Sequence, residues 1–140
     1  MNRHIAGQPL TLLLLAGTLF AGLVPGSALL QAATPVRSIP VTLGDYRFVP
    51  DSITVDSGAT VQLELSNTDS LTPHNFTLQD EAAGLDVDID VSAGRTEIVD
   101  ITPLAPGKYK FYCNKKLPFM KSHRDRGMEG TLVVAPAAPE

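Results

Sequence analysis

The sequence predicts an all-β domain, an antiparallel Greek-key sandwich of two β-sheets. Three observations favour this fold class. Short segments alternate apolar and polar residues with a period of two, clusters of turn residues separate these segments, and no stretch forms a convincing amphipathic helix. After a predicted N-terminal leader, about 107 of the 140 residues remain, Thr34 to Glu140. That length suits a single domain with one hydrophobic core.

The alternation is clearest in two segments, Thr60 to Leu65 and Leu85 to Val91. The second places Asp86, Asp88 and Asp90 on the face opposite its apolar residues. These acids suggest either a calcium ladder or the solvent face of an edge strand. The second interpretation is favoured, because the loop pattern of a calcium-binding hand is absent.

The remaining elements follow from short apolar runs bounded by turn residues. We expect strands over Val41–Phe48, Ser52–Val55, Phe76–Leu78, Glu97–Ile101, Lys108–Cys113 and Gly130–Val134. Turn residues fall at 56–58, 67–70 and 106–107. From about residue 135 the proline- and alanine-rich tail is expected to be frayed.

Residues 1–33 have the pattern of a cleaved secretory signal peptide. A short basic start with Arg3 precedes Leu10 to Val24, fifteen residues without a charge. This run is shorter than the roughly 20 residues that a membrane-spanning helix needs, although a retained membrane anchor is the alternative. Small residues allow cleavage after Ala28 or Ala33. The sequence therefore predicts export to the periplasm and no stable membrane anchor after cleavage.

Cys113 is the only cysteine of the chain, so it cannot form a disulfide within it. In an oxidising compartment such a thiol is buried and inert, paired with another chain, or a metal ligand. His74 precedes it, and His123 and Met128 follow it. Two imidazoles, a thiolate and a thioether favour copper over magnesium, calcium or manganese, and they match a type 1 copper arrangement with a weak axial methionine. Taken singly, each residue also has an ordinary structural explanation.

Three segments of the chain together resemble the cupredoxins, small type 1 (blue) copper proteins such as plastocyanin, azurin and pseudoazurin. They are Thr72–Phe76, Pro106–Cys113 and His123–Val134. The resemblance extends from about Tyr46 to the end of the last segment, most of the chain after the leader.

The resemblance implies a cupredoxin-like sandwich that holds one copper ion cycling between Cu(I) and Cu(II). His74 and His123 would bind through ring nitrogens, Cys113 as a thiolate and Met128 as the long axial ligand. Asn75, directly after the first ligand, would tie that ligand's loop to the loop after the cysteine.

One feature departs from the family pattern. Nine residues, Asn114 to Ser122, separate Cys113 from His123, more than the family usually has. Either this loop bulges and returns His123 to the same position, or the site geometry differs from the ordinary blue one. Met120 lies in the loop and is a competing thioether. Met128 is favoured because the strand entry that follows it matches the family.

Charge is unevenly distributed along the chain. Thr34 to Gly107 contains three basic and twelve acidic residues, whereas the rest contains seven basic and three acidic residues. Five of these basic residues lie between the predicted cysteine and methionine ligands: Lys115, Lys116, Lys121, Arg124 and Arg126. We expect them to form a docking surface for an acidic redox partner, with apolar contact from Leu117, Pro118 and Phe119. The alternative is a merely solvated loop. Nucleic acid is not expected as a partner, because the chain after the leader is net acidic and is predicted to be exported.

The function expected from these residues is electron transfer by a monomeric, periplasmic copper protein. A periplasmic protein for copper tolerance or delivery could use the same ligands and is the alternative, and a metal-free interaction module is a third possibility. Only two histidines follow the leader, and this excludes the second histidine-rich copper centre that a copper oxidase or nitrite reductase needs. We therefore do not expect an enzyme.

Overall fold

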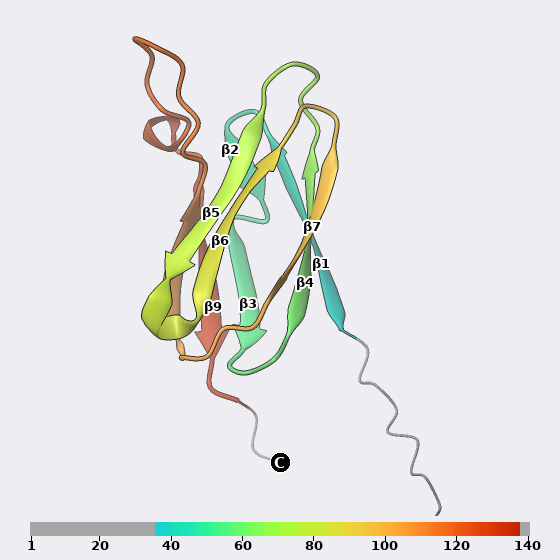
Figure 1. Cartoon of the computed structure of the whole chain (residues 1–140), viewed down its shortest axis with the longest axis vertical. Coiled ribbons are helices and arrows are strands. Elements are labelled where there is room, and N and C mark those ends of the chain that lie inside the picture. The colour runs from blue at the N-terminus through green and yellow to red at the C-terminus, as the bar shows by residue number, and fades with distance from the viewer. Residues whose placement is uncertain (1–35, 138–140) are drawn as a thin grey trace, which may run out of the picture. The chain divides into compact units, whose positions relative to one another are not determined.

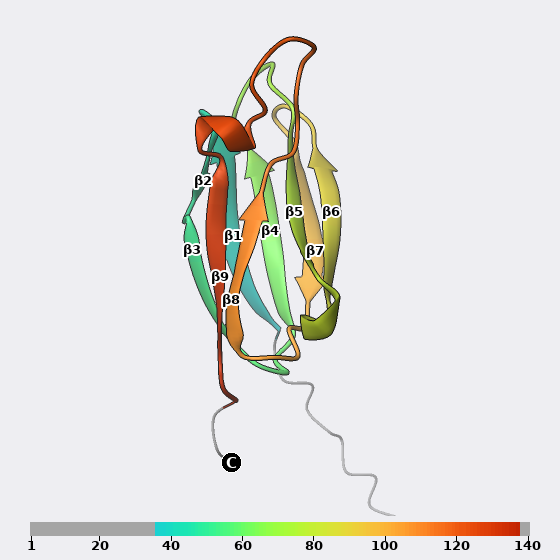
Figure 2. The ribbon, with the colours of Figure 1, turned by 90° about the vertical axis from the view of Figure 1, so that its left-hand side faces the viewer.

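A computed structural model describes residues 36–137, which form a β-sandwich of two sheets (Figures 1 and 2). The first sheet has the strand order β2 (Arg47–Val49), β1 (Arg37–Gly44), β4 (Val61–Asn67) and β7 (Thr96–Ile101). The second has the order β3 (Ser52–Asp56), β9 (Glu129–Ala135), β8 (Gly107–Tyr112), β5 (His74–Asp80) and β6 (Leu85–Val91). Two short 3-10 helices, η1 (Glu81–Ala83) and η2 (Arg124–Arg126), lie in connections. The predicted all-β sandwich is confirmed.

The strand pairing is mixed rather than purely antiparallel, which differs from the prediction. β1 pairs with β4 in parallel, and β3 pairs with β9 in parallel, while all other pairs of the described strands are antiparallel. The cause is that the chain crosses to the second sheet through β3 and returns as β4, which then runs in the same direction as β1. The antiparallel neighbours β4 with β7 and β5 with β8 are not consecutive in sequence, as Greek-key connections require.

The predicted strand Val41–Phe48 is two strands joined by a tight turn. Asp45 and Tyr46 form this turn, with φ angles of 48° and 57°. Two consecutive positive φ angles are typical of the type I′ turn, whose twist matches that of a hairpin. Tyr46 occupies a position where glycine or asparagine is usual. The turn places the Tyr46 ring at the end of the sandwich where β8 finishes and β5 begins.

The core between the sheets contains a cluster of three phenylalanines. Phe48 lies edge-on to Phe76 and Phe111, with ring centroids 5.8 and 5.1 Å away, and Phe76 and Phe111 stack at 5.0 Å. Gly130 provides the space for this cluster, because a Cβ atom there would collide with the Phe111 ring. The cluster fixes β8 two residues before Cys113, so the thiol extends from a rigid strand.

β6 is an edge strand of the second sheet, and Asp86, Asp88 and Asp90 lie exposed on it. The solvent-face interpretation of these acids is therefore confirmed. The predicted leader, residues 1–33, lies outside the described residues, as do the last three residues of the tail. Within residues 36–137, no helix is long and apolar enough to span a membrane.

Candidate metal centre

The residues singled out as metal ligands come from four places in the chain. His74 begins β5, and Cys113 directly follows β8, so these antiparallel neighbours bring the two residues to the same end of the sandwich. His123 precedes η2, and Met128 precedes β9. All four side chains are buried, with His123 the most exposed at 7% of its surface.

The nitrogen and sulfur donors converge on a common point. His74 Nδ1 and His123 Nδ1 lie 3.1 Å apart, and Cys113 Sγ lies 3.9 Å from the former and 3.3 Å from the latter. A metal bound at about 2.0 Å from each nitrogen and about 2.3 Å from the sulfur in one plane separates its donors by roughly 3.5 Å. The observed triangle is close to that size. The donor set His2Cys in this arrangement fits copper.

The orientation of His74 is set by a residue that the sequence reasoning missed. Asp69 Oδ2 lies 2.9 Å from His74 Nε2, and Asp69 Oδ1 accepts a hydrogen bond from the Asp45 N–H at 3.2 Å. Burial alone would raise the pKa of Asp69, but its hydrogen bonds with His74 and Asp45 outweigh this and lower it. An aspartate five residues before a histidine is no recognisable sequence signal.

Cys113 and His123 have their protonation states set mainly by burial. Burial raises the pKa of the Cys113 thiol, and the Asn75 N–H, 3.4 Å from Sγ, opposes this by stabilising the thiolate. Burial also lowers the pKa of His123, and nearby His74 and Arg126 add to the effect. A neutral imidazole is the form that binds metals, whereas the thiol must lose its proton on binding.

The two methionine candidates lie in different environments. Met128 is fully buried, and its backbone is bonded on both sides: its N–H donates to the His123 carbonyl at 3.0 Å, and its carbonyl accepts from the Cys113 N–H at 3.1 Å. Met120 is 44% exposed in the loop. Burial and backbone position thus place Met128, rather than Met120, beside the cysteine.

Asn75 connects the start of β5 to the residue after the cysteine. Its Oδ1 accepts from the Asn114 N–H at 2.9 Å, and its Nδ2 donates to Asn114 Oδ1 at 2.9 Å. Nδ2 also lies within hydrogen-bond distance of Thr77 Oγ1 and Asp88 Oδ1. The side chain is 1% exposed, so this network holds the two donor-bearing segments together inside the protein.

Comparison with known proteins assigns the family. A family profile described as a cupredoxin-like domain matches residues 12–134. The chain belongs to the cupredoxin-like family. The resemblance drawn from its motifs is thereby confirmed.

Solved structures with this fold include three auracyanins. The reduced auracyanin of Roseiflexus castenholzii is 23% identical, with a TM-score of 0.57, and the match covers 74% of this chain and 100% of that one. Auracyanin B is 26% identical, with a TM-score of 0.57 and coverages of 74% and 92%. Auracyanin A of Chloroflexus aurantiacus, described as a "blue" copper protein, is 23% identical, with a TM-score of 0.56 and coverages of 72% and 100%. No curated protein matches the chain in sequence.

The long loop of this cupredoxin-like domain bulges outward and returns His123 to the other donors. Figure 1 shows it projecting beyond the sheets, drawn in dark orange. The His123 N–H donates to the Lys115 carbonyl at 2.8 Å, and this bond joins the two ends of the loop at its base. Outside that bond lie Leu117 and Phe119, which are 61% and fully exposed, respectively.

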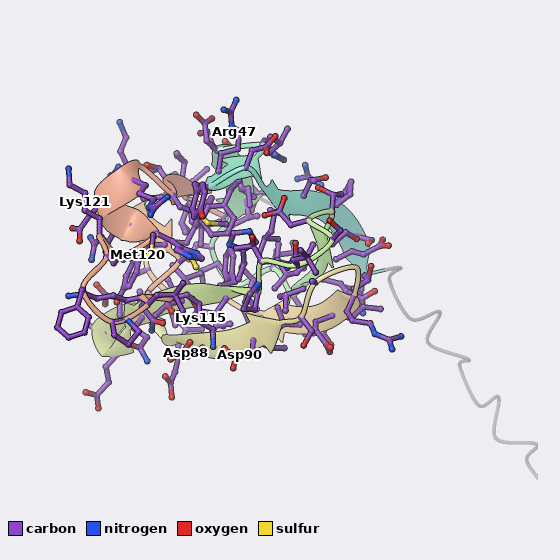
Figure 3. The ribbon with its side chains drawn as sticks, turned by 90° about the horizontal axis from the view of Figure 1, so that it is seen from above. Arg47, Asp88, Asp90, Lys115, Met120 and Lys121 are labelled. Carbon is purple, nitrogen blue, oxygen red and sulfur yellow. The ribbon has the colours of Figure 1, made fainter. Side chains whose placement is uncertain are left out.

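The structure divides the five basic residues predicted to form a docking surface. Lys115 pairs with Asp90 at 2.6 Å, Arg124 pairs with Glu129 at 3.4 Å and lies over the Tyr112 ring, and Arg126 lies over the Tyr46 ring. Among the described residues, Lys116 and Lys121 form no ion pair. Seen from above in Figure 3, Lys115 points toward Asp88 and Asp90, while Lys121 and Met120 lie away from them.

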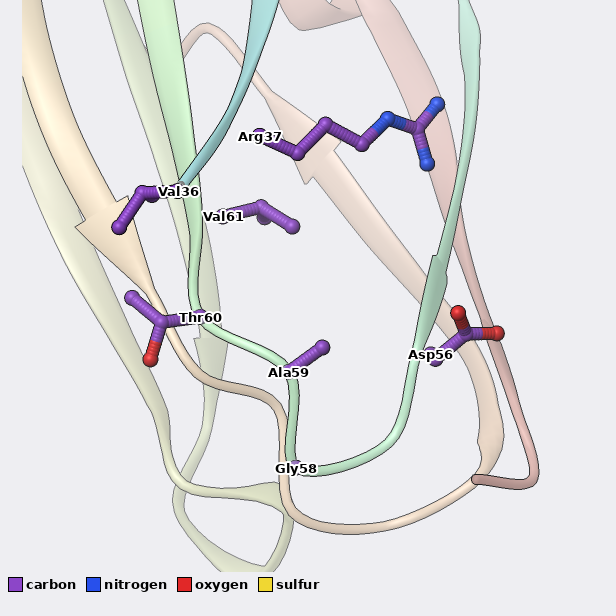
Figure 4. A pocket seen from close by; sticks show the side chains of 7 residues that line it. All are labelled: Val36, Arg37, Asp56, Gly58, Ala59, Thr60 and Val61. Atoms are coloured by element: carbon purple, nitrogen blue, oxygen red, sulfur yellow. The ribbon is translucent and has the colours of Figure 1, made fainter. Parts of the chain in front are cut away.

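A surface hollow reaches His123, one of the converging donors, from the loop side. Its lining includes His123, Tyr46, Leu71, Pro73 and Leu117, together with Thr72, Lys115 and Lys116. Tyr46 packs edge-on against His123, with ring centroids 4.8 Å apart, and so covers one side of the imidazole ring. Another hollow, bounded by the start of β1 and the turn between β3 and β4, is shown in Figure 4. None of the converging donors lines it.

Proposed function

We propose that the protein holds one copper ion with His74, Cys113, His123 and Met128 and carries single electrons between redox partners. The observation that carries the proposal is the convergence of two Nδ1 atoms and one Sγ atom within 3.1 to 3.9 Å of one another. The cupredoxin-like family and the blue copper protein from Chloroflexus aurantiacus, which shares the fold, support copper as the metal.

The protein's contribution to this function is a rigid donor set. Copper supplies a one-electron couple, Cu(I)/Cu(II). His74 and Cys113 are held by paired strands, and the backbone bonds of Met128 connect its segment to both Cys113 and His123. Such donors move little when the charge of the metal changes. His123 is the only one of the four with measurable exposure and lines a hollow, so we propose its ring edge as the route of the electron.

The first test is the visible spectrum of the copper-loaded protein. One copper per chain and intense thiolate-to-Cu(II) absorption are expected from wild type. Cys113→Ser is nearly isosteric but lacks a thiolate, so it should lose the absorption and keep the far-UV circular dichroism of the sandwich. Met120→Leu is the matched control and should keep the colour. A coloured Cys113→Ser protein would disprove the site.

Electron transfer is distinguished from copper delivery by rates. The exposed Met120, in the loop between Cys113 and His123, is the observation that favours delivery as a second candidate, since a thioether binds Cu(I) well. An electron carrier should exchange electrons with a small redox complex in milliseconds and release copper slowly to a chelator. Fast copper release with slow electron exchange would favour delivery instead.

For the partner, we propose an acidic protein surface that docks over the hollow beside His123. Lys116 and Lys121 form no ion pair within the described chain. Lys116 lines the hollow together with the exposed Leu71 and Leu117, and Lys121 lies in the same loop as Lys116. Lys115 and Arg124 already pair with Asp90 and Glu129, so we expect them to contribute less to partner binding than the sequence suggests.

The docking proposal is tested with hexacyanoferrate, an anionic redox probe. Reversing Lys116 and Lys121 to Glu should slow its bimolecular oxidation of the reduced protein and flatten the salt dependence, because such charges act on association. The matched control reverses Arg37 and Lys108, which lie on strands away from the loop. Equal rates for wild type and Lys116→Glu/Lys121→Glu at low salt would reject the docking surface.

We also propose export to the periplasm, from the pattern of residues 1–33. Recovery of the protein from a periplasmic extract with Leu29 or Thr34 as its first residue would support it. Recovery with an intact leader in the membrane fraction would refute it.

A further inference from the structure

Asp69 contacts two segments of the chain at once through its two carboxylate oxygens. Oδ2 lies 2.9 Å from His74 Nε2, and Oδ1 accepts from the Asp45 N–H at 3.2 Å. His74 is fully buried, whereas the Asp69 side chain is 20% exposed. The loop between β4 and β5, drawn green at the upper end of Figure 1, thus connects the predicted ligand to the turn between β1 and β2.

The position of Asp69 is built by its surroundings. Its own N–H donates to Asn67 Oδ1 at 3.0 Å, and the Asn67 Nδ2 donates to the carbonyls of Thr72 and Val91, both at 2.9 Å. Asn67 is 3% exposed, so these bonds fix the loop from inside.

A close approach of the backbone completes this arrangement. The Thr68 N–H donates to the Leu43 carbonyl at 2.9 Å. A Cβ atom on Gly44 would lie 2.6 Å from Thr68 Oγ1 and 3.2 Å from Asp69 Oδ1. A side chain at position 44 would therefore have to displace the Thr68 hydroxyl and would crowd the Asp69 carboxylate.

A carboxylate in this position determines what His74 can offer to a metal. An ionised carboxylate only accepts hydrogen bonds, so the 2.9 Å contact requires the proton of a neutral His74 to be on Nε2. Nδ1, which faces Cys113 and His123, then carries the lone pair. A carboxylate behind the ring also makes the imidazole a stronger donor.

We propose that Asp69 is a positioning residue that fixes the His74 tautomer and lowers the reduction potential of the copper centre. The second part rests on the proposed function. The negative charge stabilises Cu(II), the more positive state, over Cu(I), and the electron is therefore accepted less readily. The first part concerns only the protein's own atoms and holds without copper.

The tautomer is tested on the metal-free protein by nitrogen-15 NMR of the two imidazole rings. Wild type should show His74 protonated at Nε2 and not at Nδ1. Asp69→Ala removes the acceptor, and the Nδ1–H form of His74 should then become populated. Wild-type His74 protonated at Nδ1 would overturn the proposal, even if Asp69→Ala fails to fold. An unchanged His74 spectrum in folded Asp69→Ala would also overturn it.

The potential is tested by redox titration of copper-loaded wild type, Asp69→Asn and Asp125→Asn. Asp69→Asn keeps the size of the side chain but removes its charge. Only the amide oxygen can accept a hydrogen bond, whereas both carboxylate oxygens do so in wild type. The reduction potential should therefore rise. Asp125→Asn is the matched control, because it removes an exposed acid two residues after His123 that bonds only to Ser122. It should shift the potential much less.

An Asp69→Asn potential equal to that of wild type, or a shift no larger than that of Asp125→Asn, would overturn the tuning role. If wild type takes up no copper and shows no thiolate-to-Cu(II) absorption, the proposed function fails. The tautomer measurement still tests Asp69 in that case.

Discussion

The choice of axial ligand is the prediction with the clearest structural basis. The two candidates differ in burial, since Met128 is fully buried and Met120 is 44% exposed. Each is changed to Leu, which keeps volume and apolarity but removes the thioether, and separately to Ala, which also removes most of the volume.

The burial sets the expected sizes of the stability changes. Met128→Ala leaves a cavity in the core and should cost about 2–5 kcal/mol, whereas Met128→Leu should cost less than about 1.5 kcal/mol. Met120 packs little, so either change there should stay within about 0.5 kcal/mol. In a domain of this size, each kcal/mol lowers the melting temperature by about 4–8 °C.

The assay combines urea unfolding of the metal-free protein with the redox potential and visible spectrum of the copper-loaded protein. Met128→Leu should shift the potential and the charge-transfer bands with little loss of stability, and Met120→Leu should change none of these. If instead Met120→Leu moves the potential and Met128→Leu does not, the axial assignment is wrong and the loop folds over the copper.

Three further predictions concern the core, the protons and the asparagine network. Gly130→Ala should destabilise the domain by about 1–3 kcal/mol in urea, because its Cβ would overlap the Phe111 ring and the Asp51 carbonyl. Adding Phe111→Leu should recover the part due to the ring, and strict additivity of the two changes would contradict the clash with Phe111. Burial raises the pKa of Cys113 and lowers that of His123, so Cu(II) binding at pH 7 should release about one proton, that of the thiol, and the affinity for Cu(II) should rise with pH. Calorimetry in two buffers with different ionisation enthalpies measures the release, and a value of zero would contradict this prediction. Asn75→Ala should cost about 1–3 kcal/mol in thermal unfolding of the metal-free protein, and an unchanged melting temperature would show that its network does not stabilise the fold.

The fold class could be predicted because alternation with a period of two is a local property. Leu85 to Val91 shows it without ambiguity, and β6 has those bounds. The parallel pairs of β1 with β4 and of β3 with β9 could not be predicted, because they depend on which sheet each strand joins. The turn at Asp45 and Tyr46 was missed because its positive φ angles occur without the usual glycine or asparagine.

The candidate site was predicted from the order of four unusual donors, and the structure brings its two histidines and its cysteine together. Asp69 could not be found in the same way, because it is one of twelve acids between Thr34 and Gly107 and its role depends on a loop contact. The residues predicted to form a docking surface show a related limit. The sequence gives the charge of Lys115 and Arg124, but only the fold shows that Asp90 and Glu129 lie beside them.

The spacing of nine residues between Cys113 and His123 does not determine the geometry of the centre, because backbone bonds close the loop at its base. The His123 N–H binds the Lys115 carbonyl, the Met128 N–H binds the His123 carbonyl, and the Cys113 N–H binds the Met128 carbonyl, all within 2.8–3.1 Å. Residues beyond these bonds add only loop-closure entropy, about 0.6 kcal/mol for each doubling of length. Since the donors are fixed by the bonds and the strands, the exposed part of the loop is free to vary in length and side chains. The same segment can therefore contribute to the proposed docking surface without changing the position of a proposed metal ligand.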